Sequence, residues 1–140
     1  MEMPTADSGT SSEYQRLNIL VVEDDWLVLG MITDALRSNG YFVKQASNGL
    51  EALEMMTRYK PDLVILDVVM PRMDGYRVMT KMQESEELRN IPFIVVTCKT
   101  QVADVFRGAS NFAGFIAKPF RLPTLFQMVK SATDRELQAQ

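Results

Sequence analysis

Residues 63–67 read LVILD, four apolar residues that lead into a carboxylate. Two further runs have a similar composition, ILVV at 19–22 and FIVV at 93–96. Short runs that are apolar throughout are typical of strands buried on both faces of a parallel sheet, because helices cover both sides of such a sheet. The sequence therefore predicts an α/β fold in which these three runs form central strands.

Longer amphipathic stretches alternate with the apolar runs, which is the pattern of βα units around a parallel sheet. Strands are expected at residues 18–23, 41–45, 62–67, 92–97 and 114–118. A helix is expected after each of them. The fourth helix, within residues 101–110, is the least regular because Gly108 interrupts it and its apolar spacing is sparse.

Local signals indicate where the other helices begin and which face they bury. Asp25 and Asp74 are placed to cap the first and third helices, and Asn48-Gly49 forms a turn that opens the second. The last helix begins near Leu122-Pro123. The positions expected to face the core are Leu29, Ile32 and Leu36 in the first helix, Leu50, Leu53 and Met56 in the second, Val78, Met79 and Met82 in the third, and Leu122, Leu125 and Val129 in the last.

Composition fits one ordinary globular domain: the chain has 140 residues, of which 46% are hydrophobic and 24% charged. Residues 1–16 are small, polar and without periodicity, and we expect them to form a disordered tail. The domain is expected to span residues 17–133, and a polar C-terminal tail is expected at residues 134–140.

Several classes of protein are disfavoured by the composition. The net charge of −3, with both signs interspersed, gives no basic surface for direct contact with nucleic acid. No apolar run approaches the ~20 residues that a membrane span requires. A single cysteine, Cys98, and the absence of a secretory leader pattern favour the cytoplasm. The chain contains no histidine, so it has no imidazole base and no histidine metal ligand.

Polar side chains follow the predicted strands at the edge of the sheet where α/β proteins bind ligands. Glu23 and Asp24 end the first strand, Asp67 the third, Thr97 the fourth and Lys118 the fifth. Any one of the acidic residues could equally be a helix cap. Clustered carboxylates need a counter-charge that a single lysine does not supply, and a hard divalent cation such as Mg²⁺, bound by carboxylate oxygens, would provide it.

Four segments, in this order and with close to the family's spacing, resemble the receiver domain of bacterial response regulators. They are ILVVEDD at 19–25, LDVVMP at 66–71 followed by MDG at 73–75, VVT at 95–97 and AKPF at 117–120. The resemblance covers about residues 17–133. It implies a doubly wound, flavodoxin-like, five-stranded parallel sheet with the strand order 2-1-3-4-5 and helices on both faces, as in chemotaxis regulators.

The resemblance also implies roles for individual residues. Asp67 would accept a phosphoryl group from a phosphohistidine on a sensor histidine kinase or a histidine phosphotransfer protein. Glu23, Asp24, Asp67 and the carbonyl of Val69 would hold Mg²⁺. Lys118 would pair with the acyl phosphate and form a cis peptide with Pro119, while Thr97 and the aromatic Phe115 would switch position and change a surface that binds a downstream protein.

Two other functions are compatible with parts of this pattern. A Mg²⁺-dependent phosphatase of the haloacid dehalogenase type also forms an aspartyl phosphate, but it needs a second aspartate two residues after the nucleophile, where this chain has Val69. A constitutive protein-interaction module with the same fold is the second alternative.

Overall fold

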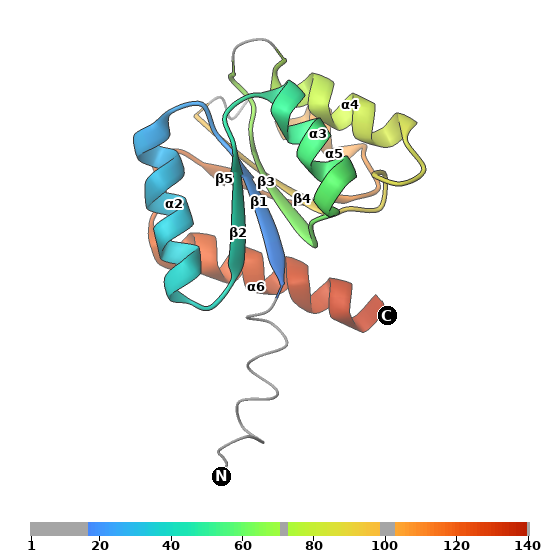
Figure 1. Ribbon diagram of the computed structural model, residues 1–140. Coiled ribbons are helices and arrows are strands. Elements are labelled where there is room, and N and C mark those ends of the chain that lie inside the picture. Colours follow the sequence, from blue (N-terminus) through green and yellow to red (C-terminus); the bar gives the residue numbers. More distant parts are fainter. Residues whose placement is uncertain (1–16, 71–72, 99–102, 140) are drawn as a thin grey trace.

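The computed structural model describes residues 17–70, 73–98 and 103–139 (Figure 1). Within these residues, five parallel strands form one sheet with the order β2-β1-β3-β4-β5. The strands are β1 (Asn18–Val22), β2 (Phe42–Ala46), β3 (Leu63–Asp67), β4 (Phe93–Thr97) and β5 (Phe112–Ala117). The predicted fold class and strand order are confirmed.

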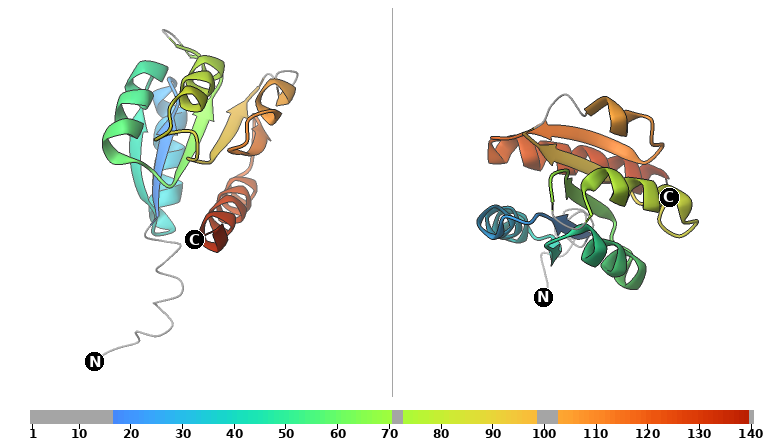
Figure 2. Two further views of the ribbon diagram at one scale, coloured as in Figure 1. Left: turned by 90° about the vertical axis from the view of Figure 1, so that its right-hand side faces the viewer. Right: turned by 90° about the horizontal axis from the view of Figure 1, so that it is seen from above.

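Helices cover both faces of the sheet (Figure 2). They are α2 (Trp26–Ser38), α3 (Gly49–Tyr59), α4 (Gly75–Glu84), α5 (Ala103–Arg107) and α6 (Leu122–Ala139). Successive residues of β1 point to opposite faces. Ile19 and Val21 therefore pack in the core beneath α2 and α6, whereas Leu20 and Val22 pack beneath α3, α4 and α5.

The central position of β3 follows from its composition. All five of its residues are buried, and Leu63, Val64 and Leu66 are completely inaccessible to solvent. Burying an aliphatic side chain of this size contributes about 2 kcal/mol. The same run therefore stabilises the sheet and fixes Asp67, its last residue, at the carboxyl edge.

Side-chain caps begin three helices; the caps at Asp25 and Asp74 were predicted, and Asn48 caps the helix that its predicted turn opens. Asp25 accepts hydrogen bonds from the backbone N–H groups of Leu27 and Val28 at 3.0 and 3.4 Å. Asn48 caps α3 at 2.9 Å and Asp74 caps α4 at 3.0 Å. Each cap satisfies a donor that the first helical turn leaves unpaired. The caps also set the direction in which the chain leaves the carboxyl edge of the sheet.

Some predictions of burial were wrong. Leu50 was expected to face the core, but it is 51% exposed. Met56 is buried as expected, and Gly49 and Ala52 are buried beside it, so α3 is rotated away from the Leu50 side. Leu122 is 36% exposed at the start of α6, whereas Leu125 and Val129 are buried as expected. Helical spacing identifies an apolar stripe, but the neighbouring elements decide which edge of the stripe is covered.

Element boundaries also differ from the predictions. β5 begins at Phe112, two residues before the predicted start, because Phe112 pairs with Phe93 and an irregularity in the register follows. The helix α6 continues to Ala139, so the predicted polar tail at 134–140 is helical as far as that residue. The predicted disordered tail at 1–16 lies outside the described residues. None of the described helices combines the length and apolar character needed to cross a bilayer.

Candidate functional site

The register of the sheet brings the predicted strand ends together. Val22 pairs with Leu66, so Glu23 follows β1 beside Asp67, and Asp67 itself pairs with Val96. The backbone N–H of Lys118 donates to the carbonyl of Thr97 at 2.9 Å. Residues that are far apart in the sequence therefore share one edge of the sheet.

Three carboxylates form the acidic part of the site. Glu23, Asp24 and Asp67 each offer an oxygen, and these oxygens all lie within 4.8 Å of one another. Glu23 and Asp67 are only 2% and 5% exposed, whereas Asp24 is open to solvent. Hard carboxylate oxygens with one open side suit Mg²⁺, which retains several water ligands and can share its remaining positions with phosphate oxygens.

Lys118 neutralises part of this charge. Its Nζ lies 2.7 Å from Glu23 Oε1 and 3.8 Å from Asp67 Oδ1. The other oxygen of Glu23, Oε2, accepts a hydrogen bond from the backbone N–H of Asp25 at 3.1 Å, so both oxygens of this carboxylate are held. The Lys118–Pro119 peptide is cis, as the resemblance implied.

Burial shifts the pKa of the central carboxyl group upward. In the metal-free protein, the pKa of Asp67 is raised from 3.8 to about 7, chiefly by burial and then by the charge of Glu23. The positive charge of Lys118 and a hydrogen bond from the backbone of Val69 lower this pKa, but they do not compensate. A cation bound to the carboxylates would favour the ionised form of Asp67, because it replaces the solvation that burial removes.

The pKa of Lys118 is also above its ordinary value. Burial alone would lower it, but the hydrogen bond to Glu23 and the negative charges of Asp67 and Glu23 outweigh that effect. Lys118 is therefore fully protonated at neutral pH. It presents a fixed positive charge beside Asp67.

The remaining predicted residues lie around this centre. Thr97 is completely buried at the end of β4, beside the last residue of β5 in the sheet register. Phe115 is partly buried on β5 and packs against the core beneath α3, α4 and α5. Val69 follows Asp67 by two positions, and its side chain is 47% exposed. Sequence reasoning had named all of these residues.

An apolar cleft lined by the residues that follow Asp67 was not predicted. It has a volume of about 640 Å³ and is lined by Val68, Val69, Met70, Asp74, Tyr76, Val105 and Phe106. The rings of Tyr76 and Phe106 meet edge to face, with their centroids 6.3 Å apart. Tyr76 and Val105 are separated widely in the sequence, and both are about half exposed, so periodicity alone gave no signal for this cleft.

Gly75 fixes the loop that leads away from Asp67. Its N–H donates to the carbonyl of Val68 at 2.8 Å, and a Cβ atom at Gly75 would lie only 2.7 Å from the carbonyl oxygen of Asp67. Only a residue without a side chain permits this approach. The Asp74-Gly75 pair was visible in the sequence, but its contact with the backbone of Asp67 was not.

Known proteins resemble this chain over most of its length. The family model described as the response regulator receiver domain matches residues 19–130. The chain is 35% identical over 120 residues to the response regulator MprA of Mycobacterium leprae, an alignment covering 85% of this chain and 52% of that protein. The chain thus spans about half the length of that relative.

Two other similar proteins are matched over nearly their whole length. The polar-differentiation response regulator DivK of Brucella anthropi is 31% identical over 115 residues, which cover 81% of this chain and 94% of DivK. The receiver domain of the sensor histidine kinase PA1611 of Pseudomonas aeruginosa PAO1, solved with a magnesium ion coordinated in its active site cleft, is 28% identical. Its TM-score is 0.74, with 82% of this chain and 95% of that chain covered.

The family model covers most of the chain, DivK is matched almost from end to end, and the fold has the same strand order that the resemblance implied. None of these matches is a haloacid dehalogenase phosphatase. The chain belongs to the response regulator receiver domain family and is a phosphoacceptor domain of two-component signalling.

Proposed function

We propose that Asp67 is the phosphoacceptor of this domain, with Mg²⁺ as cofactor and Lys118 as the residue that pairs with the transferred phosphoryl group. The observation that carries this proposal is the convergence of three carboxylates within 4.8 Å, with the Nζ of Lys118 3.8 Å from Asp67 Oδ1. Asp67 is the member of the cluster that ends the central strand, and the residue after it, Val68, lines the open cleft.

The chemical step is a displacement at phosphorus. A carboxylate oxygen of Asp67 attacks the phosphorus of a phosphohistidine, the P–N bond breaks, and its electron pair remains on the imidazole nitrogen of the donor. Most of the gain in such transfers comes from positioning and charge neutralisation. Asp67 must be ionised to attack, and Lys118 stabilises negative charge as it develops on the phosphoryl oxygens.

The ligands proposed for Mg²⁺ are Glu23, Asp24, Asp67 and the backbone carbonyl of Val69. When bound, Mg²⁺ supplies further positive charge to the phosphoryl oxygens and favours the ionised form of Asp67. The related receiver domain of PA1611, with magnesium coordinated in its active site cleft, supports this assignment. Glu23 is held by Lys118 and by the backbone of Asp25, so its position requires little reorganisation.

We further propose that Thr97 and Phe115 form the switch. Phosphorylation adds nearly two negative charges and three acceptor oxygens, to which the Thr97 hydroxyl can donate. Movement of Thr97 would leave space for Phe115 to turn inward and would reshape the surface around α5 and β5. To change the ratio of active to inactive conformation from 1:99 to 99:1, phosphorylation must favour the active conformation by about 5.5 kcal/mol. A hydrogen bond to a charged group contributes only about 1.5 to 3 kcal/mol. We therefore expect partial population of the active state without phosphate.

The donor must be found outside these residues, because the sequence contains no histidine. We propose that a sensor histidine kinase or a histidine phosphotransfer protein donates the phosphoryl group and that a downstream protein binds the phosphorylated domain. We propose that both interactions take place in the cytoplasm. Self-catalysed phosphoryl transfer from small phosphodonors and slow self-dephosphorylation belong to the same proposal.

The test uses the intact protein with acetyl phosphate, in the presence of Mg²⁺ or EDTA, followed by intact-mass measurement. We expect a labile phosphoryl adduct that requires Mg²⁺ and that is lost in Asp67→Asn. Asp34→Asn, an exposed aspartate on α2, serves as the control and should be labelled like the wild type. An adduct that persists in Asp67→Asn would overturn the assignment, and no adduct in the wild type would favour the constitutive interaction module.

A further inference from the structure

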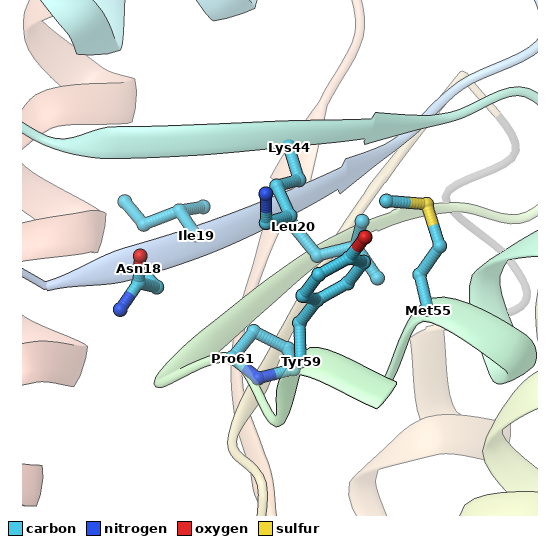
Figure 3. Close-up of a pocket in the computed structure, with 7 residues that line it drawn as sticks. All are labelled: Asn18, Ile19, Leu20, Lys44, Met55, Tyr59 and Pro61. Carbon is cyan, nitrogen blue, oxygen red and sulfur yellow. The ribbon is translucent and has the colours of Figure 1, made fainter. Parts of the chain in front are cut away.

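A groove lies near the amino ends of β1 and β3, at the end of the sheet opposite Asp67. We call it the β1–α3 groove. It has a volume of about 250 Å³, and Figure 3 shows the side chains that line it. None of them belongs to the site around Asp67. Those that matter below are Leu20 of β1, Lys44 of β2, Met55 and Tyr59 of α3, and Pro61.

The groove forms because α3 covers this edge of the sheet only in part. β2 is an edge strand, and Leu20 pairs with Lys44 in the register, so their side chains lie on the same face of the sheet. The helix ends at Tyr59, and Lys60 then takes a left-handed conformation with a φ of 50°, which turns the chain toward β3. The side chain of Lys44 therefore stays open to solvent beside the buried Leu20.

Apolar groups form the floor and one wall of the groove. Leu20 and Pro61 are buried, Met55 is partly buried, and Tyr59 is 46% exposed. A thioether and an aromatic ring both pack favourably against a second aromatic ring. The groove therefore favours a ligand with a planar aromatic body.

One ammonium group supplies charge to this apolar lining. The Nζ of Lys44 lies 4.2 Å from the centroid of the Tyr59 ring. An ammonium group has three donors, so the ring leaves donors available for another acceptor. Among the described residues, no carboxylate lies within 4.0 Å of this group. The nearby carboxylate of Asp62 instead accepts a hydrogen bond from the backbone N–H of Asn18 at 2.8 Å.

We propose that the β1–α3 groove binds a small aromatic carboxylate, with its ring against Met55 and Pro61 and its carboxylate beside the Nζ of Lys44. Pockets for drug-sized ligands have volumes of roughly 300 to 1,000 Å³, so a groove of about 250 Å³ suits a ligand with a single ring. The binding does not depend on Mg²⁺, on phosphorylation or on the role of Asp67.

The test is an NMR titration of the intact protein, in EDTA, with labelled methionine methyl groups. The probe is benzoate, and Met55→Leu identifies the resonance of Met55. We expect benzoate to shift this resonance saturably, with a dissociation constant in the millimolar range. Benzamide, which lacks the charge, and acetate, which lacks the ring, should each bind at least about fivefold more weakly, because each loses one of the two contacts.

Variants of the lysine test the charged contact. Lys44→Met, which keeps the unbranched stem, should weaken the binding of benzoate about fivefold, whereas Lys44→Arg should bind benzoate like the wild type. Lys81→Met, at an exposed lysine on α4, is the matched control and should leave binding unchanged.

A Met55 resonance that does not respond to benzoate would overturn the proposal, and so would equal binding of benzoate and benzamide. An apparent dissociation constant that rises with protein concentration would also overturn it, because a second copy of the chain would then compete for the groove.

Discussion

The raised pKa of Asp67 predicts that the metal-free protein becomes less stable as the pH rises. The folded protein holds a proton on this carboxyl group up to a pKa of about 7, whereas the unfolded chain releases it near 3.8. Between these values the folded state binds more protons than the unfolded state, so the free energy of unfolding falls with increasing pH. The protonated Asp67 makes its full contribution to stability below the pKa of the unfolded chain. That contribution is lost once the pH exceeds the pKa of the folded protein.

The structure gives the size of the effect. At an effective dielectric constant of 20, the attraction between Lys118 and Asp67 at 3.8 Å amounts to about 4 kcal/mol. The repulsion between Glu23 and Asp67, whose oxygens lie within 4.8 Å, is at least about 3 kcal/mol on the same scale. Because the attraction to Lys118 and the repulsion from Glu23 nearly cancel, burial decides that the pKa of Asp67 is raised. Between pH 5 and the pKa of about 7, the free energy of unfolding falls by about 1.4 kcal/mol per pH unit, or about 3 kcal/mol in total.

The perturbation that isolates this group is Asp67→Asn, which keeps the shape and removes the titration. Urea unfolding of both proteins in EDTA, followed by far-UV circular dichroism from pH 5 to pH 8, gives the difference in the free energy of unfolding. We expect the wild type to lose about 3 kcal/mol relative to Asp67→Asn over this range. Asp34→Asn, the exposed control, should follow the wild type.

Addition of Mg²⁺ provides the second arm of the experiment. A ligand that binds only the folded state at 100 times its dissociation constant adds about 2.7 kcal/mol of stability. The gain should be largest at pH 8, where Asp67 is ionised, and should be smaller in Asp67→Asn. If the free energies of unfolding of the wild type and Asp67→Asn depended on pH in the same way in EDTA, burial would not raise the pKa of Asp67.

Four further predictions concern two residues close to Asp67 in the fold, Val69 and Cys98, and two helical glycines, Gly49 and Gly30. Val69→Asn should shorten the lifetime of the phosphoryl adduct, because an amide can orient the hydrolytic water, whereas Val69→Ala should leave the lifetime unchanged. The decay of the adduct is followed by intact-mass measurement, and equal decay in both variants would contradict this role of residue 69. Cys98→Ala should speed labelling by acetyl phosphate if the thiol narrows access to Asp67, and an unchanged rate would exclude that steric effect. Gly49→Ala should destabilise the protein by about 1 to 3 kcal/mol in urea unfolding, because the added methyl group would overlap the carbonyl oxygen of Met73. Gly30→Ala, with nothing within 4 Å of the new methyl group, should instead stabilise the protein by about 0.5 to 1 kcal/mol. If both variants lost stability, the overlap with Met73 would not be the cause of the difference expected between them.

Local signals were sufficient where a structural feature depends on residues close in the sequence. The apolar run that ends in Asp67 predicted a buried central strand, and Asp25 and Asp74 predicted the starts of two helices. They were insufficient for Leu50, which belongs to the correct apolar stripe but lies at its exposed edge. The early start of β5 also required the pairing of Phe112 with Phe93, which are distant in the sequence.

From the sequence alone it follows that acidic residues, a threonine and a lysine end the strands of a parallel sheet, because strand periodicity and chain direction place those ends at one edge. How these groups interact depends on the packing of the folded chain. Lys118 lies closer to Glu23 than to Asp67, and the carboxyl group of Asp67 keeps a proton to about pH 7 without a metal. Electrostatic energies depend on separations of a few ångströms and on burial, and both quantities are set by segments that the sequence places far apart.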